Sequence, residues 1–264
     1  MPINFQDEKN RGTYAARKAD DTWINRLQEL VDVSNQHVAD IGCGGGIYSK
    51  AMADEGAKRV TGVDFSESIL ASAKDNCRSM PNVMFAYGDA YDTGLAGGEY
   101  DVVLERALIH HLDDLPGCFM EACRLLRPEG TIIVQDRTPE DCLLPGSATH
   151  IRGYFFSKYP ELAQTEIARR HTGMKVGEAL RQAGFAGIEE HSFWETRKVY
   201  PDIDKLADDL LQRTGRSILH ELSDVQLEEL VEHIKEQLRD TPAPMVEKDR
   251  WTIWKAVKPV HDEA

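Results

Sequence analysis

The sequence is short of positive charge. It contains 31 lysine and arginine residues against 45 aspartate and glutamate residues, which gives a formal net charge of -14 at pH 7. A chain with this balance is repelled by nucleic acids and by anionic membranes unless a local basic patch offsets it. We therefore expect no nucleic-acid partner and no membrane partner.

Paired cysteines and long apolar runs are also missing. The five cysteines show neither the spacing of a disulfide framework nor that of a zinc site. We expect free thiols in a reducing compartment and no metal site. No stretch is long and apolar enough to span a membrane, and the N-terminus carries no signal-like apolar run. These absences predict a cytoplasmic protein.

What the sequence has instead is a regular alternation of short apolar runs with helical patterns. Alternation of this kind predicts parallel β-α-β units with right-handed crossovers. The runs are continuously apolar, as expected for strands that helices cover on both faces. The first five predicted strands are His37–Ile41, Val60–Val63, Val83–Tyr87, Tyr100–Leu104 and Thr131–Val134.

Glycine is concentrated in one turn, where the first strand ends in Asp40-Ile-Gly-Cys-Gly-Gly-Gly46 and a helical pattern follows. A strand, a glycine-rich turn and a helix start bring a nucleotide-like ligand close to bare backbone. Dinucleotide enzymes use the spacing G-x-G-x-x-G, in which Gly42 and Gly44 fit the first two positions but Ile47 stands at the third. A glycine motif alone decides little, so the other strand ends must identify the ligand.

Five elements in order resemble the class I S-adenosylmethionine-dependent methyltransferases, in the small-molecule branch similar to the ubiquinone/menaquinone methyltransferases. Each element alone is common, whereas the set in this order is specific. The resemblance implies a Rossmann-like fold, S-adenosylmethionine as cofactor and methyl transfer as the reaction. The five elements are the turn after Asp40, Val63-Asp64-Phe-Ser66, Gly88-Asp89-Ala90, Tyr100-Asp-Val-Val-Leu-Glu105 with His110-His-Leu112, and Leu125-Leu-Arg-Pro-Glu-Gly-Thr131.

The resemblance also assigns cofactor contacts. The backbone at Gly42, Gly44 and Gly46 would receive the methionine part, while Asp40 orients the turn or contacts the ligand. Two vicinal ribose hydroxyls suit a carboxylate acceptor, and the adenine amino group suits another. The remaining candidate contacts are Asp64 with Phe65 for the ribose, Asp89 with Ala90 for the adenine, Glu105 after the fourth strand, and Tyr14 and Arg17 in an N-terminal helical segment that is alternatively a solvated helix.

Three residues after the fourth strand, Glu105, His110 and His111, are the candidate catalytic residues. Methyl transfer from a sulfonium is an in-line displacement, so a general base helps only when the acceptor must lose a proton. A histidine could accept that proton near neutral pH. Alternatively, Glu105 shapes the pocket and one histidine is a buried hydrogen-bonding residue.

The acceptor is narrowed by two further absences. The fourth strand is not followed by the Asn/Asp-Pro-Pro-Tyr/Phe run in which the adenine and amide methyltransferases resemble one another, and the Pro-Cys pair of the cytosine enzymes is missing. We therefore expect a small organic acceptor. Six basic residues of the later chain would pair with an anionic acceptor or remain surface charges: His150, Arg152, Arg169, Arg170, Arg213 and Arg216.

Taken together, these patterns predict one α/β domain over residues 1–264. It has a Rossmann-like, mostly parallel seven-stranded sheet with helices on both faces and a helical lid over the carboxyl ends of the strands. Two alternatives remain: a non-enzymatic S-adenosylmethionine-binding protein, and an NAD(P)-dependent oxidoreductase. The predicted parts are a helical preface (1–32), the cofactor-binding half (33–136), helical cap or substrate elements (137–172 and 200–244) and a last strand (245–258).

Overall fold

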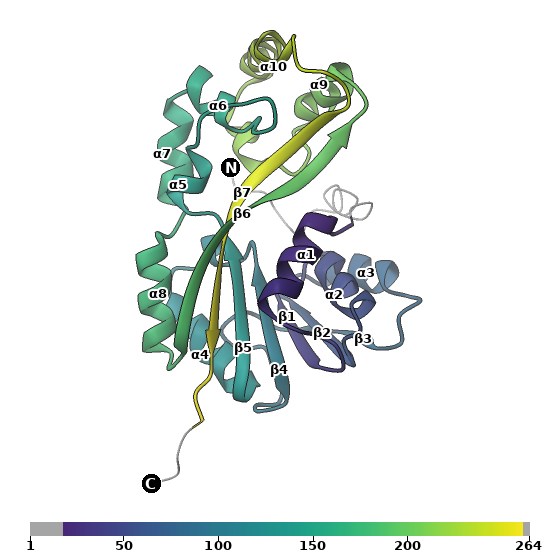
Figure 1. The fold of residues 1–264 in the computed structure, drawn as a ribbon, viewed down its shortest axis with the longest axis vertical. Helices are drawn as coiled ribbons and strands as arrows, with labels where there is room; N and C mark the ends of the chain where they lie inside the picture. The colour runs from purple at the N-terminus through teal and green to yellow at the C-terminus, as the bar shows by residue number, and fades with distance from the viewer. Residues whose placement is uncertain (1–17, 261–264) are drawn as a thin grey trace. The chain divides into compact units, whose positions relative to one another are not determined.

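The computed structural model describes residues 18–260, so the predicted contacts Tyr14 and Arg17 lie outside the described residues. The described chain divides into two compact units (Figure 1). The sheet unit comprises residues 18–136, 171–192 and 252–260, and the helical unit comprises residues 137–170 and 193–251. Most of the residues predicted as cap elements belong to the helical unit.

The sheet has seven strands in the order β3-β2-β1-β4-β5-β7-β6. Strands β1 to β5 pair in parallel with their neighbours, and β7 runs antiparallel to β5. The predicted mostly parallel seven-stranded α/β fold is therefore confirmed. The strands are β1 (His37–Ile41), β2 (Arg59–Asp64), β3 (Val83–Tyr87), β4 (Tyr100–Arg106), β5 (Leu126–Asp136), β6 (Ala186–Tyr200) and β7 (Met245–Val257).

Helices cover both faces of the sheet within the sheet unit, with α4 and α8 on one face and α1, α2 and α3 on the other (Figure 1). Successive side chains of a strand point to opposite faces, so the strands contribute to two apolar layers. Ala39 and Ile41 of β1 join the core beneath α4 and α8, whereas Asp40 between them bonds Ser49 of α2. The helices of this unit are α1 (Asp21–Leu30), α2 (Ile47–Asp54), α3 (Glu67–Asn76), the 3₁₀ turn η2 (Ile109–His111), α4 (Leu115–Leu125) and α8 (Gly173–Gln182).

Strand β1 pairs with β2 on one side and with β4 on the other. The order of the strands along the chain therefore reverses between β1 and β4. In open α/β sheets, ligands bind outside the carboxyl ends of the strands at such a reversal. The register places Ile41 opposite both Val63 and Glu105. The glycine turn, Asp64 and Glu105 therefore leave the sheet at one edge.

The helical unit has its own apolar core, in which Phe155, Leu210 and Leu230 are fully buried. A charged network accompanies this core. Arg216 is 2% exposed and its guanidinium lies 2.6 Å from both Asp209 Oδ2 and Glu247 Oε2. The elements wholly within this unit are α5 (Pro139–Cys142), α6 (Gly153–Lys158), α7 (Glu161–Ala168), α9 (Ile203–Leu211), the 3₁₀ turn η3 (Ser217–Glu221) and α10 (Asp224–Leu238).

None of the helices in the part of the chain that the structure describes is both long enough and apolar enough to cross a membrane.

Candidate active site

The glycine turn after β1 needs glycine for two different physical reasons. Gly42, Gly44 and Gly46 have φ angles of 72°, 52° and 76°, a left-handed backbone that favours glycine. At Gly46, an added Cβ would lie 2.9 Å from the Phe85 ring, so packing also demands glycine there. At Gly44, nothing lies within 4 Å of an added Cβ, which leaves the backbone open to a ligand.

Asp64, at the end of β2, is held against this turn by backbone donors. The Gly44 N–H donates to Asp64 Oδ2 at 3.0 Å, and the Ser66 N–H donates to Asp64 Oδ1 at 3.0 Å. Burial raises the pKa of Asp64, whereas the hydrogen bonds from the backbone N–H groups lower it. Each carboxylate oxygen can accept a further hydrogen bond, so the group can also receive two hydroxyls of a ligand.

Asp40, which precedes the glycine turn, is bonded to the helix that follows the turn. Its Oδ2 accepts a hydrogen bond of 2.5 Å from the Ser49 hydroxyl of α2. Burial raises the pKa of Asp40 to about 6, although the Ser49 hydrogen bond opposes the rise. Asp40 therefore joins β1 to α2, and its role at the turn stays a prediction.

The loop after β3 places two predicted adenine contacts in different environments. Asp89 is exposed, and its Oδ1 accepts backbone hydrogen bonds from Tyr91 at 2.7 Å and Asp92 at 2.9 Å. Ala90 is buried in the core beneath α4. Phe65, which follows Asp64, is 51% exposed and presents an aromatic surface beside the turn.

Glu105, at the end of β4, is fully buried. Its Oε1 accepts a hydrogen bond of 3.4 Å from the Cys118 thiol of α4, while its Oε2 has no hydrogen-bond partner among the described residues. Burial raises the pKa of Glu105 to about 7, with the thiol hydrogen bond acting in the opposite direction. The side chain therefore lies among core residues, below the edge at which β4 ends.

His110 and His111 lie in the 3₁₀ turn after β4. His110 Nδ1 is 2.8 Å from Oδ2 of the buried Asp136, at the end of β5. The rings of His110 and His111 are 4.0 Å apart between centroids. His171 Nε2 lies 3.0 Å from the carbonyl oxygens of Ile109 and Leu112, a contact that joins His171 to this turn. The two predicted histidines are thus together, and a carboxylate orients one of them.

Sequence reasoning missed three partners of these residues: Ser49, Cys118 and Asp136. Asp136 carried a usable signal, because it ends an apolar strand as Asp64 does. The other two lie on helices that only the tertiary fold brings to the strand ends. Among residues 18–260, no cluster of three or more histidine, cysteine, aspartate or glutamate side chains could hold a metal ion.

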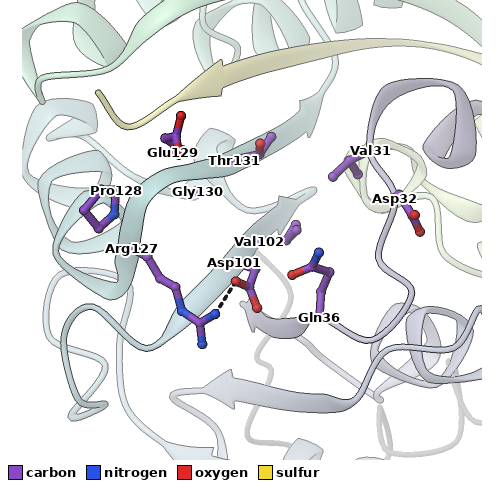
Figure 2. Close-up of a pocket in the computed structure, with 10 residues that line it drawn as sticks. All are labelled: Val31, Asp32, Gln36, Asp101, Val102, Arg127, Pro128, Glu129, Gly130 and Thr131. Carbon is purple, nitrogen blue, oxygen red and sulfur yellow. Dashed lines mark hydrogen bonds and ion pairs between the residues drawn. The ribbon is translucent and has the colours of Figure 1, made fainter. Parts of the chain in front are cut away.

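A hollow in the sheet unit lies away from the predicted site residues (Figure 2). It has a volume of about 250 Å³ and is lined by the amino-terminal parts of β4 and β5, including Asp101 and Arg127, and by the segment between α1 and β1. These two side chains form an ion pair of 2.6 Å (Figure 2). None of the predicted site residues lines this hollow, so it is a separate feature from the carboxyl edge of the sheet.

All six basic residues predicted as anion contacts are engaged with carboxylate or carbonyl oxygens within the helical unit, among them Arg170, which lies 2.7 Å from Glu166 Oε1. Arg216 binds Asp209 and Glu247, as described above. Arg213 donates to the carbonyl oxygens of Leu219 and Leu222 at 3.0 and 3.1 Å, which ties α9 to η3.

Comparison with known proteins covers the same part of the chain. Residues 39–134 match the family model described as a methyltransferase domain. This part of the sheet unit is therefore similar to a methyltransferase domain, and the resemblance that the motifs carry, to the class I S-adenosylmethionine-dependent methyltransferases in the branch similar to the ubiquinone methyltransferases, is confirmed.

The ubiquinone biosynthesis O-methyltransferase of Methylococcus capsulatus is 36% identical over 110 residues, which cover 40% of this chain and 45% of the relative. The chain spans about half the length of the curated relatives it matches.

Two solved structures show the same fold. The first is phosphoethanolamine N-methyltransferase 2 of Haemonchus contortus, in complex with phosphomonomethylethanolamine and S-adenosylhomocysteine. It has a TM-score of 0.59 and 21% identity, and the match covers 97% of this chain and 60% of that one. The second is the [4+2]-cyclase SpnF, with a TM-score of 0.57, 18% identity and coverage of 90% and 81%. Since the same fold carries a cyclase, the activity must be argued from the site.

Proposed function

We propose that the protein is an S-adenosylmethionine-dependent methyltransferase that acts on a small organic molecule by in-line methyl transfer. The observation that carries the proposal is the pairing of Asp64 with Gly44. A buried carboxylate with remaining acceptor capacity adjoins a left-handed glycine whose open side has room for a ligand. The match over residues 39–134 supports the same assignment.

The residues at this edge fit the proposed cofactor. The turn of Gly42, Gly44 and Gly46 would receive the methionine part, and Asp64 would accept the ribose hydroxyls beside Phe65. Asp89 and Ala90 would flank the adenine. When bound, S-adenosylmethionine supplies the electrophilic methyl group. The chain supplies orientation and a site without bulk water, which an in-line displacement requires.

His110 is the proposed general base for acceptors that must lose a proton. A carboxylate only accepts hydrogen bonds, so the contact with Asp136 keeps the proton of a neutral His110 on Nδ1. Nε2 then presents the lone pair that can take a proton. His111 would steady the His110 ring from the side. We assign Glu105 to shaping the wall of the site, because its carboxyl is enclosed beside Cys118.

The net charge and the free cysteines support the proposed acceptor class and cellular compartment. The net charge of -14 favours a small-molecule acceptor over a nucleic acid or an anionic membrane. The five cysteines are free thiols, which supports a reducing compartment, and we propose the cytoplasm.

Isothermal titration with S-adenosylmethionine and with S-adenosylhomocysteine tests the proposal. The wild-type protein should bind both, and Asp64→Asn should weaken both roughly tenfold or more, because one charge-assisted hydrogen bond is worth about 1.5–3 kcal/mol. The matched control is Glu67→Gln, which removes the same charge from an exposed position three residues away. Absence of binding by the wild type at millimolar ligand would refute the function. Unchanged affinity in Asp64→Asn would refute only the ribose contact.

A further inference from the structure

The end of α3 is bonded to the glycine turn that follows β1. Asn76, the last residue of α3, donates from its side-chain Nδ2 to the carbonyl oxygen of Gly45 at 2.8 Å. The next residue, Cys77, is buried, and its Sγ lies 3.6 Å from the carbonyl oxygen of Gly46. An added Cβ at Gly46 would lie 3.3 Å from the same sulfur. Two successive carbonyls of the turn are thus contacted by residues 31 positions further along the chain.

Gly45 is also the residue of this turn whose backbone donor remains available. The N–H groups on either side of it are engaged, because Gly44 donates to Asp64 Oδ2 at 3.0 Å and Gly46 donates to the carbonyl oxygen of Cys43 at 3.0 Å. Among residues 18–260, the N–H of Gly45 has no acceptor, although Gly45 is buried. Buried N–H groups without a partner are rare in native proteins, and those that precede a helix can be satisfied by a ligand.

A run of glycines does not hold its own shape. Glycine adopts left-handed and right-handed backbone with similar ease, so ordering the three consecutive residues Gly44 to Gly46 costs conformational entropy. If the ligand had to order the turn, that cost would be subtracted from its affinity. The bond from Asn76 fixes the carbonyl of Gly45 and thereby restrains the direction of the Gly45 N–H. The turn is therefore ordered by the chain itself.

We propose that Asn76 is a positioning residue for the cofactor, which holds Gly45 so that its N–H is presented to the carboxylate of the methionine part. The assignment rests on the proposed function, in which the glycine turn receives that part of S-adenosylmethionine. Asn76 lies outside every motif that predicted the site. Cofactor affinity consequently depends on a side chain that acts through the backbone of Gly45.

Asn82 provides a matched control within the sheet unit. Its Nδ2 donates to the carbonyl oxygen of Ala57 at 2.9 Å, and both asparagines are half-buried. Asn76→Ala and Asn82→Ala each remove one bond between an amide and a carbonyl, so urea denaturation should show similar losses of stability. In isothermal titration with S-adenosylhomocysteine, Asn76→Ala should bind roughly fivefold more weakly than the wild type, and Asn82→Ala should bind as the wild type does. Unchanged affinity in Asn76→Ala, or an equal loss in Asn82→Ala, would overturn the proposal.

A shortened ligand separates this role from general damage to the site. 5′-Methylthioadenosine keeps the adenine and the ribose but lacks the methionine carboxylate. Asn76→Ala should therefore bind it as tightly as the wild type does. Equal weakening of 5′-methylthioadenosine and S-adenosylhomocysteine would overturn the assignment to the Gly45 N–H.

Amide hydrogen exchange, followed by mass spectrometry on the ligand-free proteins, tests the ordering of the turn without the cofactor. Peptides that cover residues 42–46 should exchange roughly fivefold faster in Asn76→Ala than in the wild type, and at the wild-type rate in Asn82→Ala. Unchanged exchange in Asn76→Ala would overturn the proposal. If the wild type binds neither ligand, the proposed function fails, whereas the exchange rates still decide whether Asn76 orders the turn.

Discussion

Glu105 makes a sharp prediction about stability, because its carboxyl is fully buried and, among the described residues, its one hydrogen bond comes from the uncharged Cys118 thiol. Glu105→Gln keeps the shape of the side chain and leaves an amide oxygen to accept the Cys118 thiol. The variant has no charge at any pH. It should therefore differ from the wild type only where the wild-type carboxyl would ionise.

The magnitude follows from the pKa of Glu105, which burial raises from its ordinary value of 4.5 to about 7. A raised pKa means that the folded protein holds the proton more tightly than the unfolded chain. The stabilisation is therefore fully present below pH 4.5 and is lost as pH rises through about 7. Each unit of the difference between these two pKa values corresponds to about 1.4 kcal/mol of the free energy of unfolding. The contribution of Glu105 to that free energy therefore falls by about 3 kcal/mol by pH 8.

Urea denaturation followed by circular dichroism between pH 5 and pH 8 measures this difference. The free energy of unfolding of Glu105→Gln should exceed that of the wild type by about 3 kcal/mol at pH 8, and the excess should shrink toward pH 5. Glu121→Gln is the matched control on α4. Burial raises the pKa of Glu121, but hydrogen bonds from Arg124 and Thr93 lower it by more. The charged form of Glu121 is therefore stabilised in the folded protein, and Glu121→Gln should be less stable than the wild type near neutral pH. A difference between Glu105→Gln and wild type that does not vary with pH would refute the reasoning.

Two further predictions concern the edge of the sheet. Gly46→Ala should destabilise the protein by about 2 kcal/mol or more and weaken S-adenosylmethionine binding, because it adds a clash with Phe85 to left-handed strain. Gly94→Ala has the same backbone strain with open space around it and should cost only about 1 kcal/mol in urea denaturation, so equal losses would contradict the packing argument. Asp136→Asn should leave cofactor affinity unchanged but lower label transfer from methyl-labelled cofactor to small molecules of a cell extract roughly a hundredfold, because His110 loses the carboxylate that orients it. Undiminished labelling would exclude His110 as the base.

Local sequence patterns determined the fold class and the position of the glycine turn. Short apolar runs alternating with helical periods specify parallel β-α-β units, and each strand from β1 to β5 was located from residues within it. The turn around Gly44 was found in the same way, because left-handed backbone leaves a glycine signature in the sequence itself. Asp64 was identified because it ends a strand, and all parallel strands end at one edge.

The partners of these residues were decided by the tertiary structure. His110 lies 26 residues from Asp136, and Asn76 lies 31 residues from Gly45, so no periodic pattern connects either pair. The burial of Glu105 is also decided by the tertiary structure. Glu105 resembles any strand-end carboxylate in the sequence, and only the helix packed over it turns it into an enclosed group with a raised pKa. Secondary structure follows from neighbouring residues, whereas proton affinity and hydrogen-bond partners depend on residues that only folding brings together.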